Sequence, residues 1–186
     1  MQEQLNKILH KCIRGERHSQ RNLYELLAPK MFVVCLRYSR NREDAEEVLQ
    51  EGFIKVFEHL SQFTFSGSFE GWVRKIMVNC SLQKYRSRSQ LHAVVNIDDI
   101  RIENSQENEN IYAKLDVKEL IELVQQLSPG YRMVFNLYVF EKMKHREIAA
   151  HLGISEGTSK SNLSDAKAIL QKAIKKSELI AKQNVM

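Results

Sequence analysis

Several polar side chains near the C-terminal end have the types and the spacing to recognise nucleic acid. On a helix they would share one face, opposite a set of apolar and small residues, because both sets recur at intervals of three or four. Ammonium, amide and hydroxyl groups can hydrogen-bond to base edges and phosphates from a helix in a major groove. The polar set is Lys160, Ser161, Asn162, Ser164 and Lys167, and the opposite set is Ser159, Leu163, Ala166 and Leu170. This chemistry is recognition rather than catalysis.

The neighbouring residues predict the element that positions this face. Residues 144–170 have the pattern of two short helices joined by a tight turn, with Ile148 and Leu152 on one face of the first helix. Gly153 follows directly and can take a left-handed backbone conformation after a helix end at little cost. Ser155 then suits the N-cap of the second helix. The pattern indicates a helix-turn-helix, and the alternative is an ordinary helical hairpin whose second helix is solvated.

The composition indicates a helical protein with two small domains. A chain of 186 residues with two prolines and seven glycines, 27% charged and 43% hydrophobic, favours helices over strands or disorder. The formal net charge is +5, and residues 72–92 contain Arg74, Lys75, Lys84, Arg86 and Arg88 but no acidic residue. Clustered lysine and arginine indicate binding to a polyanion.

The sequence shows no pattern for catalysis, metal binding or membrane insertion. Cys12, Cys35 and Cys80 are widely separated and the six histidines lack ligand spacing, which argues against a disulfide framework, a metal site or a cofactor. No P-loop, paired-carboxylate or nucleophile arrangement is present. No apolar run approaches the roughly 20 residues needed to cross a bilayer. We therefore expect a cytoplasmic protein that is not an enzyme.

The strongest amphipathic segment begins after Asn41, which suits a helix N-cap. Its inward residues are predicted to be Ala45, Val48, Leu49, Gly52, Phe53, Val56, Phe57 and Leu60. Its outward residues are predicted to be Asp44, Glu47, Gln50, Glu51, Ile54, Lys55 and Glu58. A charged face is usually just solvated, but an exposed isoleucine within an acidic surface leaves room for a basic protein partner.

Three phenylalanines, Phe63, Phe65 and Phe69, are interleaved with Ser, Thr and Gly in residues 62–71, beside Trp72. On a polar loop next to a basic helix, these rings would suit stacking against bases. The alternative is that the aromatic side chains fold back to cap the core. The helix from Trp72 is predicted to turn Val73, Ile76, Met77 and Cys80 inward, and Arg74, Lys75, Asn79, Lys84 and Arg86 outward.

Two features divide the chain. Pro29 lies within an otherwise helical pattern from 20 to 38, where proline fits a helix break or a first-turn position better than a helix interior. Residues 92–113 are acidic and polar, which predicts an extended linker, either functional or a plain tether. We therefore assign a first domain to residues 1–91, a linker to 92–113 and a second domain of about four helices to 114–186.

Three long segments in this order carry a resemblance to a known family. They are DAEEVLQEGFIKVFEHLSQF at 44–63, FEGWVRKIMVNCSLQKYRSR at 69–88 and LSPGYRMVFNLYVFEKMKHREIAAHLGISEGTSKS at 127–161. With them, nearly the full chain resembles the extracytoplasmic-function (ECF) group of bacterial RNA polymerase sigma factors. The resemblance implies an all-α fold of two small helical domains joined by a flexible acidic linker. It also implies a non-enzymatic subunit that directs core RNA polymerase to promoters and helps open the DNA.

The resemblance assigns roles to three sets of residues. Binding to core RNA polymerase, at the clamp helices of the largest subunit, would involve Asp44, Glu47, Val48, Gln50, Glu51 and Ile54. Recognition and melting of the −10 element would involve Phe63, Phe65, Phe69, Trp72, Lys75, Asn79 and Arg86. Recognition of the −35 element would involve Ser155, Thr158, Lys160, Ser161, Asn162, Ser164, Asp165 and Lys167. The polymerase flap and an anti-sigma factor are further partners implied by the resemblance.

The second helix of the helix-turn-helix departs from the family pattern. Many relatives carry arginines where Asn162 and Asp165 stand, so this helix is less basic. Asp165 could accept a hydrogen bond from a cytosine amino group or pair with a lysine on the helix surface. The alternative function is a free-standing helix-turn-helix regulator acting as a dimer without core polymerase. That alternative leaves the acidic face and the aromatic loop unexplained.

Overall fold

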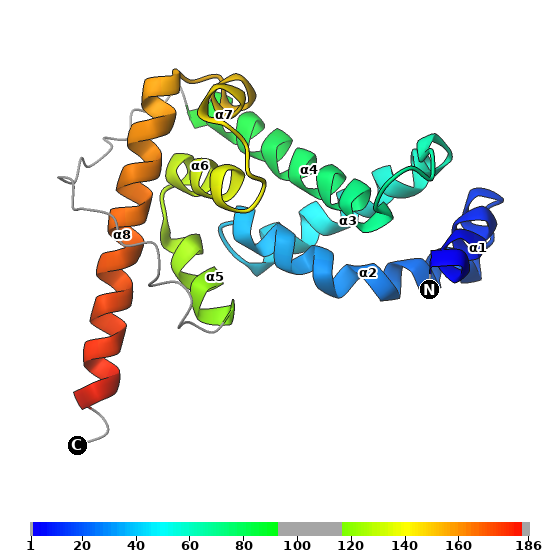
Figure 1. The fold of residues 1–186 in the computed structure, drawn as a ribbon, viewed down its shortest axis with the longest axis horizontal. Helices are drawn as coiled ribbons and strands as arrows, with labels where there is room; N and C mark the ends of the chain where they lie inside the picture. The colour runs from blue at the N-terminus through cyan, green and yellow to red at the C-terminus, as the bar shows by residue number, and fades with distance from the viewer. Residues whose placement is uncertain (1, 93–116, 184–186) are drawn as a thin grey trace. The chain divides into compact units, whose positions relative to one another are not determined.

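The computed structural model of the protein describes residues 2–92 and 117–183, and within these ranges it contains helices and no strand (Figure 1). The predicted all-α fold is confirmed. The chain divides into two compact units, Met1–Tyr85 and Arg86–Met186, which are described separately below. Apart from His92, the predicted linker at 92–113 lies outside the described residues. The domain boundaries assigned from the sequence stay a prediction.

The first unit is built from four α-helices and a short 3-10 helix among the described residues. They are α1 (Gln2–Ile13), α2 (Arg17–Tyr38), α3 (Arg42–Glu58), η1 (Leu60–Gln62) and the part of α4 (Phe69–His92) up to Tyr85. In Figure 1, α2 and α3 run side by side, and α1 packs on α2 and on η1. The core is formed by their inward faces, with Leu23, Val48, Phe53, Val73 and Met77 all almost completely buried.

The start of α3 shows why this segment is helical. The Asn41 side chain accepts a hydrogen bond from the Asp44 amide over 2.9 Å, which satisfies one of the N–H groups that a helix start leaves free. Glu43 and Asp44 place negative charge in the first turn, where it interacts favourably with the helix dipole. The N-cap predicted at Asn41 is confirmed.

Pro29 lies in the interior of α2, so the predicted helix break or first-turn position is wrong. Proline cannot donate a backbone hydrogen bond, and its ring crowds the carbonyl four residues earlier. Pro29 is exposed, so that side of the helix faces water, while Leu27 and Met31 on the inward side are buried. Packing of the inward face therefore keeps α2 continuous across the proline.

The second unit contains α5 (Val117–Gln126), α6 (Pro129–Val139), α7 (His145–Leu152) and α8 (Glu156–Gln183) in its described part. Proline occupies the first turn of α6, where its missing N–H costs nothing. The buried Arg132 guanidinium donates to the carbonyls of Gln125 and Leu127 over 2.9 and 2.7 Å, and so satisfies acceptors at the end of α5. Helix α8 packs on α5, α6 and α7 through a face that includes Leu163 and Ile174.

A glycine allows α3 and α4 to approach closely. A Cβ at Gly52 would lie 2.2 Å from the Sδ atom of Met77 and 2.9 Å from its Cε. Met77 is 0% exposed, so its side chain cannot swing aside into solvent. Any larger residue at position 52 must therefore push the two helices apart or displace core side chains.

We expect Gly52→Ala to lower the free energy of unfolding, measured by urea denaturation. Overpacking costs about 1–3 kcal/mol, more than the roughly 1 kcal/mol that alanine gains in a helix. The control is Gly157→Ala in α8, where an added Cβ would lie an ordinary 3.6 Å from Ser155 Oγ and stability should not fall. A Gly52→Ala variant as stable as the wild type would contradict the close approach.

Candidate nucleic-acid and partner-binding surfaces

The outward face of α3 exposes a small set of the residues predicted to bind core polymerase. Glu47, Gln50 and Ile54 are exposed. The Ile54 side chain is 58% exposed although it is aliphatic and would gain free energy from burial. Asp44 and Val48 are instead buried, with exposed fractions of 5% and 1%. Asp44, which was expected to face outward, therefore lies with Val48 beneath this surface, and the predicted role of both residues in binding core polymerase stays a prediction.

A lysine and an arginine neutralise part of the acidity of α3. Lys84 of α4, which was expected to point outward, has its Nζ 3.5 Å from Asp44 Oδ1 and also pairs with Glu47. Arg40 adds a second cation, its Nε 2.8 Å from Asp44 Oδ2. Because a buried carboxylate is costly unless it is paired, Asp44 fixes the positions of both cations.

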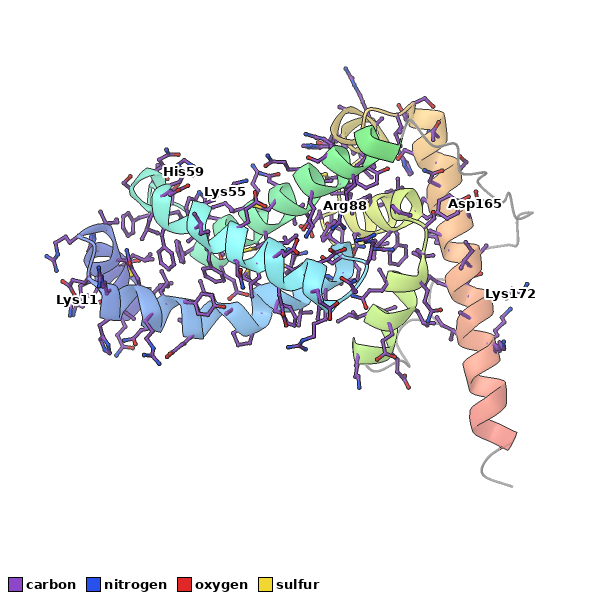
Figure 2. All side chains as sticks on the ribbon, turned by 180° about the vertical axis from the view of Figure 1, so that it is seen from behind. Lys11, Lys55, His59, Arg88, Asp165 and Lys172 are labelled. Atoms are coloured by element: carbon purple, nitrogen blue, oxygen red, sulfur yellow. The ribbon has the colours of Figure 1, made fainter. Side chains whose placement is uncertain are left out.

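Lys55 makes the second link between α3 and α4. Its Nζ donates to Glu51 on its own helix over 2.7 Å and to Gln83 of α4 over 3.0 Å. Figure 2 labels Lys55 on α3, one turn before His59. The charge of Glu51 is therefore already engaged, which leaves Gln50 and Ile54 as the parts of the predicted surface that are open to a partner.

The aromatic residues between η1 and α4 form a cluster, and two of them belong to the core. The ring of Phe63 lies 5.1 Å from that of Phe69 and 5.7 Å from that of Trp72, and Phe69 lies 5.6 Å from Trp72. Phe63 is 7% exposed and Phe69 is 1% exposed. Their burial favours the alternative in which these aromatics cap the core. Phe65 remains exposed and Trp72 is half-buried.

The outer face of α4 carries the accessible remainder of the predicted −10 set. Lys75 and Asn79 are exposed and four residues apart, so they lie one turn apart on the same face, and Arg86 is exposed further along the helix. Together with Phe65 and Trp72, this face offers cations, an amide and aromatic surface. These groups suit contact with unpaired bases and with phosphates.

The geometry of the helix-turn-helix agrees with the sequence. Gly153 has a left-handed backbone (φ 69°), and the Thr158 amide donates to Ser155 Oγ over 2.9 Å at the start of α8. The inward residues Ser159, Leu163, Ala166 and Leu170 are all buried. The predicted helix-turn-helix is confirmed.

The exposed face of α8 carries most of the predicted −35 set. The exposed members are Ser155, Thr158, Lys160, Ser161 and Ser164, and the half-buried members are Asn162, Asp165 and Lys167. Lys160 pairs with Glu156 over 2.8 Å on the same face. Figure 2 shows Asp165 on α8. Its carboxylate accepts a hydrogen bond from the Tyr131 hydroxyl of α6 over 3.3 Å, a partner that the sequence did not suggest.

His145 is a residue at this surface that sequence reasoning missed. Its Nδ1 lies 2.9 Å from the Oγ of buried Ser159 on α8, and its ring stacks on Tyr138 at 4.9 Å between centroids. Burial, followed by the positive charges of Lys160 and Lys167, lowers the pKa of His145 below its ordinary value. Only the spacing of a histidine at the start of α7 and a serine on the inward face of α8 could have hinted at this contact.

The three cysteines, Cys12, Cys35 and Cys80, are buried free thiols on helices of the first unit. Burial raises the pKa of Cys12 to about 11 and that of Cys35 to about 12, so both stay protonated near neutral pH. Within residues 2–92 and 117–183, no group of three His, Cys, Asp or Glu side chains could hold a metal ion. No helix in the described part of the chain has both the length and the hydropathy to span a membrane.

Comparison with known families accounts for both units. The family model described as Sigma-70 region 2 matches residues 23–90, and the one described as Sigma-70, region 4 matches residues 118–170. The chain belongs to the sigma-70 family. It is a sigma factor of the ECF group, and sigma factors are transcription initiation factors that direct RNA polymerase to promoters.

Two relatives are described by name as ECF RNA polymerase sigma factors. The ECF RNA polymerase sigma factor SigE of Mycolicibacterium smegmatis is 31% identical over 73% of this chain, which spans only 54% of that relative. The ECF RNA polymerase sigma factor SigW of Bacillus subtilis is 21% identical over 94% of this chain and 99% of its own length. A solved structure of the sigma factor RpoE with the anti-sigma factor NepR from Bartonella quintana is 23% identical, with a TM-score of 0.49 over 83% of this chain and 96% of that one.

Acidification is expected to destabilise this sigma factor in part through His145. Because folding lowers the pKa of His145, the unfolded chain binds its proton more readily, and stability is lost as the pH falls through about 6.5. Between about pH 7.5 and about pH 5.5, the free energy of unfolding should fall more in the wild type than in His145→Gln. The other histidines are common to both proteins. Equal losses of unfolding free energy in urea denaturation would therefore contradict a lowered pKa of His145 in the folded protein.

Proposed function

We propose that this sigma factor binds core RNA polymerase through the exposed face of α3, opens the −10 element with α4 and its aromatic loop, and reads the −35 element with α8. The observation that carries the proposal is the exposed Ile54 within the acidic face of α3. A free-standing regulator would have no need of this face, whereas a subunit that docks on a larger enzyme does. In this proposal the polymerase performs the chemistry, and the chain supplies recognition only.

The contact with core polymerase is proposed to centre on Gln50 and Ile54, rimmed by Glu47 and Glu51. An aliphatic side chain supplies apolar area that can be buried, and the surrounding carboxylates favour a basic partner such as the clamp helices named by the resemblance. The ion pairs with Lys84 and Lys55 hold the rim in place before binding. Less side-chain freedom is then lost on association, which favours affinity.

The −10 contact is proposed to use Phe65, Trp72, Lys75, Asn79 and Arg86. Melting a promoter exposes bases that have lost their stacking partners, and aromatic rings can replace this stacking at about 1–3 kcal/mol per base. The cations of α4 would follow the phosphate backbone of the separated strand. Phe63 and Phe69 are proposed to support the loop from the core, because their burial leaves no face open to a base.

The −35 contact is proposed to involve the first three turns of α8, where Ser155, Thr158, Lys160, Ser161 and Ser164 are exposed. Docking of this face in a major groove follows the usual geometry of a helix-turn-helix. Asn162, Asp165 and Lys167 would contribute from the edges of this face. The hydrogen bond from Tyr131 orients the Asp165 carboxylate and favours its role as a fixed acceptor over a mobile one.

Two further partners and the place of action remain proposals. The polymerase flap and an anti-sigma factor are proposed on the resemblance and family membership alone, since nothing in the described residues identifies their binding surfaces. We also propose that the chain acts in the cytoplasm, because core polymerase and promoter DNA are there.

Removing the apolar side chain from α3 should weaken binding to core RNA polymerase without unfolding the protein. We expect Ile54→Ala to raise the dissociation constant about tenfold, which corresponds to about 1.4 kcal/mol, in an equilibrium assay with fluorescently labelled chain. Leu26→Ala on α2 is a matched control, because Leu26 is also 58% exposed. If the wild type binds no core polymerase but binds duplex DNA with sequence specificity, the free-standing regulator becomes the better function.

Reversing the charge on the α8 face should change how the chain binds DNA. We expect Asp165→Arg to tighten binding to duplexes of random sequence and to steepen the dependence of log K on log salt by roughly 0.9 for one added phosphate contact. The control is Glu122→Arg on α5, where the wild-type side chain is exposed, because it makes the same change of charge away from the helix-turn-helix. Equal slopes for the two variants would show that Asp165 does not face DNA.

A further inference from the structure

The aromatic loop between η1 and α4 contains an unusual backbone conformation. Phe65 has a φ of 57°, in the left-handed region that bulky residues seldom adopt, and Gly67 two residues later has a φ of 88°. The hydroxyls of Thr64 and Ser66 lie 2.9 Å apart on either side of Phe65. A side chain held in this region persists only where its surroundings fix it. The contacts of the Phe65 ring and the hydrogen bond between Thr64 and Ser66 are therefore the contacts available to hold the loop in this shape.

The Phe65 ring has two aromatic neighbours, one on α1 and one at the start of its own loop. The His10 ring of α1 stacks on it, with 4.8 Å between the ring centroids and 21° between the planes. The Phe63 ring lies 5.3 Å away at 56°, and Phe63 is itself buried against Phe69 and Trp72. The core thus supports one neighbour, and α1 supplies the other from a segment more than fifty residues earlier in the chain.

Helix α1 is anchored well enough to hold a ring in place. Leu9 and Cys12, on either side of His10, are 0% and 2% exposed, and α1 packs on both α2 and η1. His10 itself is exposed, as are Lys7 and Lys11 one turn and one residue away. The stack with Phe65 is consequently the contact through which α1 reaches the loop, and it sits at the protein surface beside the exposed edge of Phe65.

We propose that His10 is a positioning residue that holds Phe65, and with it loop 64–68, in the conformation that meets separated promoter DNA. This inference rests on the proposed role of the loop in opening the −10 element. Without the His10 ring, Phe65 loses one of its aromatic neighbours and can relax to a negative φ, which turns its ring away from the present position. The loop must then be ordered again when DNA binds, and affinity falls by the cost of that ordering.

The test compares His10→Ala with His10→Phe and with Lys11→Ala, all in the full chain. His10→Phe keeps a ring that can stack, and Lys11→Ala changes the neighbouring exposed residue on the same helix. Hydrogen exchange of the amides in residues 63–68 reports the order of the loop. The function of the loop is measured by binding to a fork-junction DNA. This DNA carries the −10 sequence that wild-type holoenzyme selects from a random library. Thermal unfolding verifies that each variant is folded.

We expect His10→Ala to speed exchange in residues 63–68 and to weaken fork-junction binding about three- to tenfold, the range expected for an aromatic pair. Binding to the fully paired −35 element should not change, and His10→Phe should restore both readouts. Lys11→Ala should leave loop exchange as in the wild type. The rescue by phenylalanine separates positioning of the ring from a general loss of stability, which the melting temperature would show.

Unchanged exchange in residues 63–68 of His10→Ala would overturn the inference, and so would faster exchange with undiminished fork-junction binding. A failure of the proposed function has a different signature, because wild-type holoenzyme would then select no −10 sequence. Loop exchange would still decide in that case whether His10 holds Phe65.

Discussion

The close packing of α3 on α4 is the constraint on which the first unit of this sigma factor depends. Gly52 has no side chain, so the Met77 side chain can occupy the space between the two helices. The carboxylate of Asp44 can be buried there because Lys84 and Arg40 neutralise its charge. These contacts join the face proposed to bind polymerase to the helix proposed to bind DNA. A partner that docks on α3 would therefore contact a helix already packed against the one that carries the proposed −10 surface, so less binding energy would be spent on ordering that surface.

In the second unit, the position of the polar face of α8 is fixed mainly by backbone conformation, capping and apolar packing. A left-handed Gly153, the Ser155 cap and the buried face of α8 fix the angle at which the polar face is presented. His145 joins the start of α7 to Ser159 on α8, so a titratable group lies directly behind the proposed recognition surface. Sequence-specific contacts require such fixed geometry, because a side chain that must first be ordered loses part of the energy of each hydrogen bond.

Ion pairs within the chain engage charged groups on both α3 and α8. Much of the acidity of α3 is paired within the unit, and the Lys160 ammonium on α8 is paired with Glu156. Exposed ion pairs of this kind contribute little to stability, and they can exchange partners when polymerase or phosphate approaches. The exposed apolar and aromatic groups, Ile54 and Phe65, have no such alternative in water, which makes them the natural centres of their contacts.

The sequence by itself determined the helical class, the Asn41 and Ser155 caps, the helix-turn-helix and the inward faces of α3 and α8. These features are local, because capping and a period of 3.6 residues involve neighbours within a turn or two. Tertiary structure alone decided that α2 continues through Pro29, that Phe63 and Phe69 are buried, and that Lys84 turns to α3. It also decided the partners of Asp165 and Phe65, which come from Tyr131 and His10. Each of these outcomes depends on packing, most often against a residue tens of positions away. Such contacts cannot be predicted from the spacing of residues within a single helix.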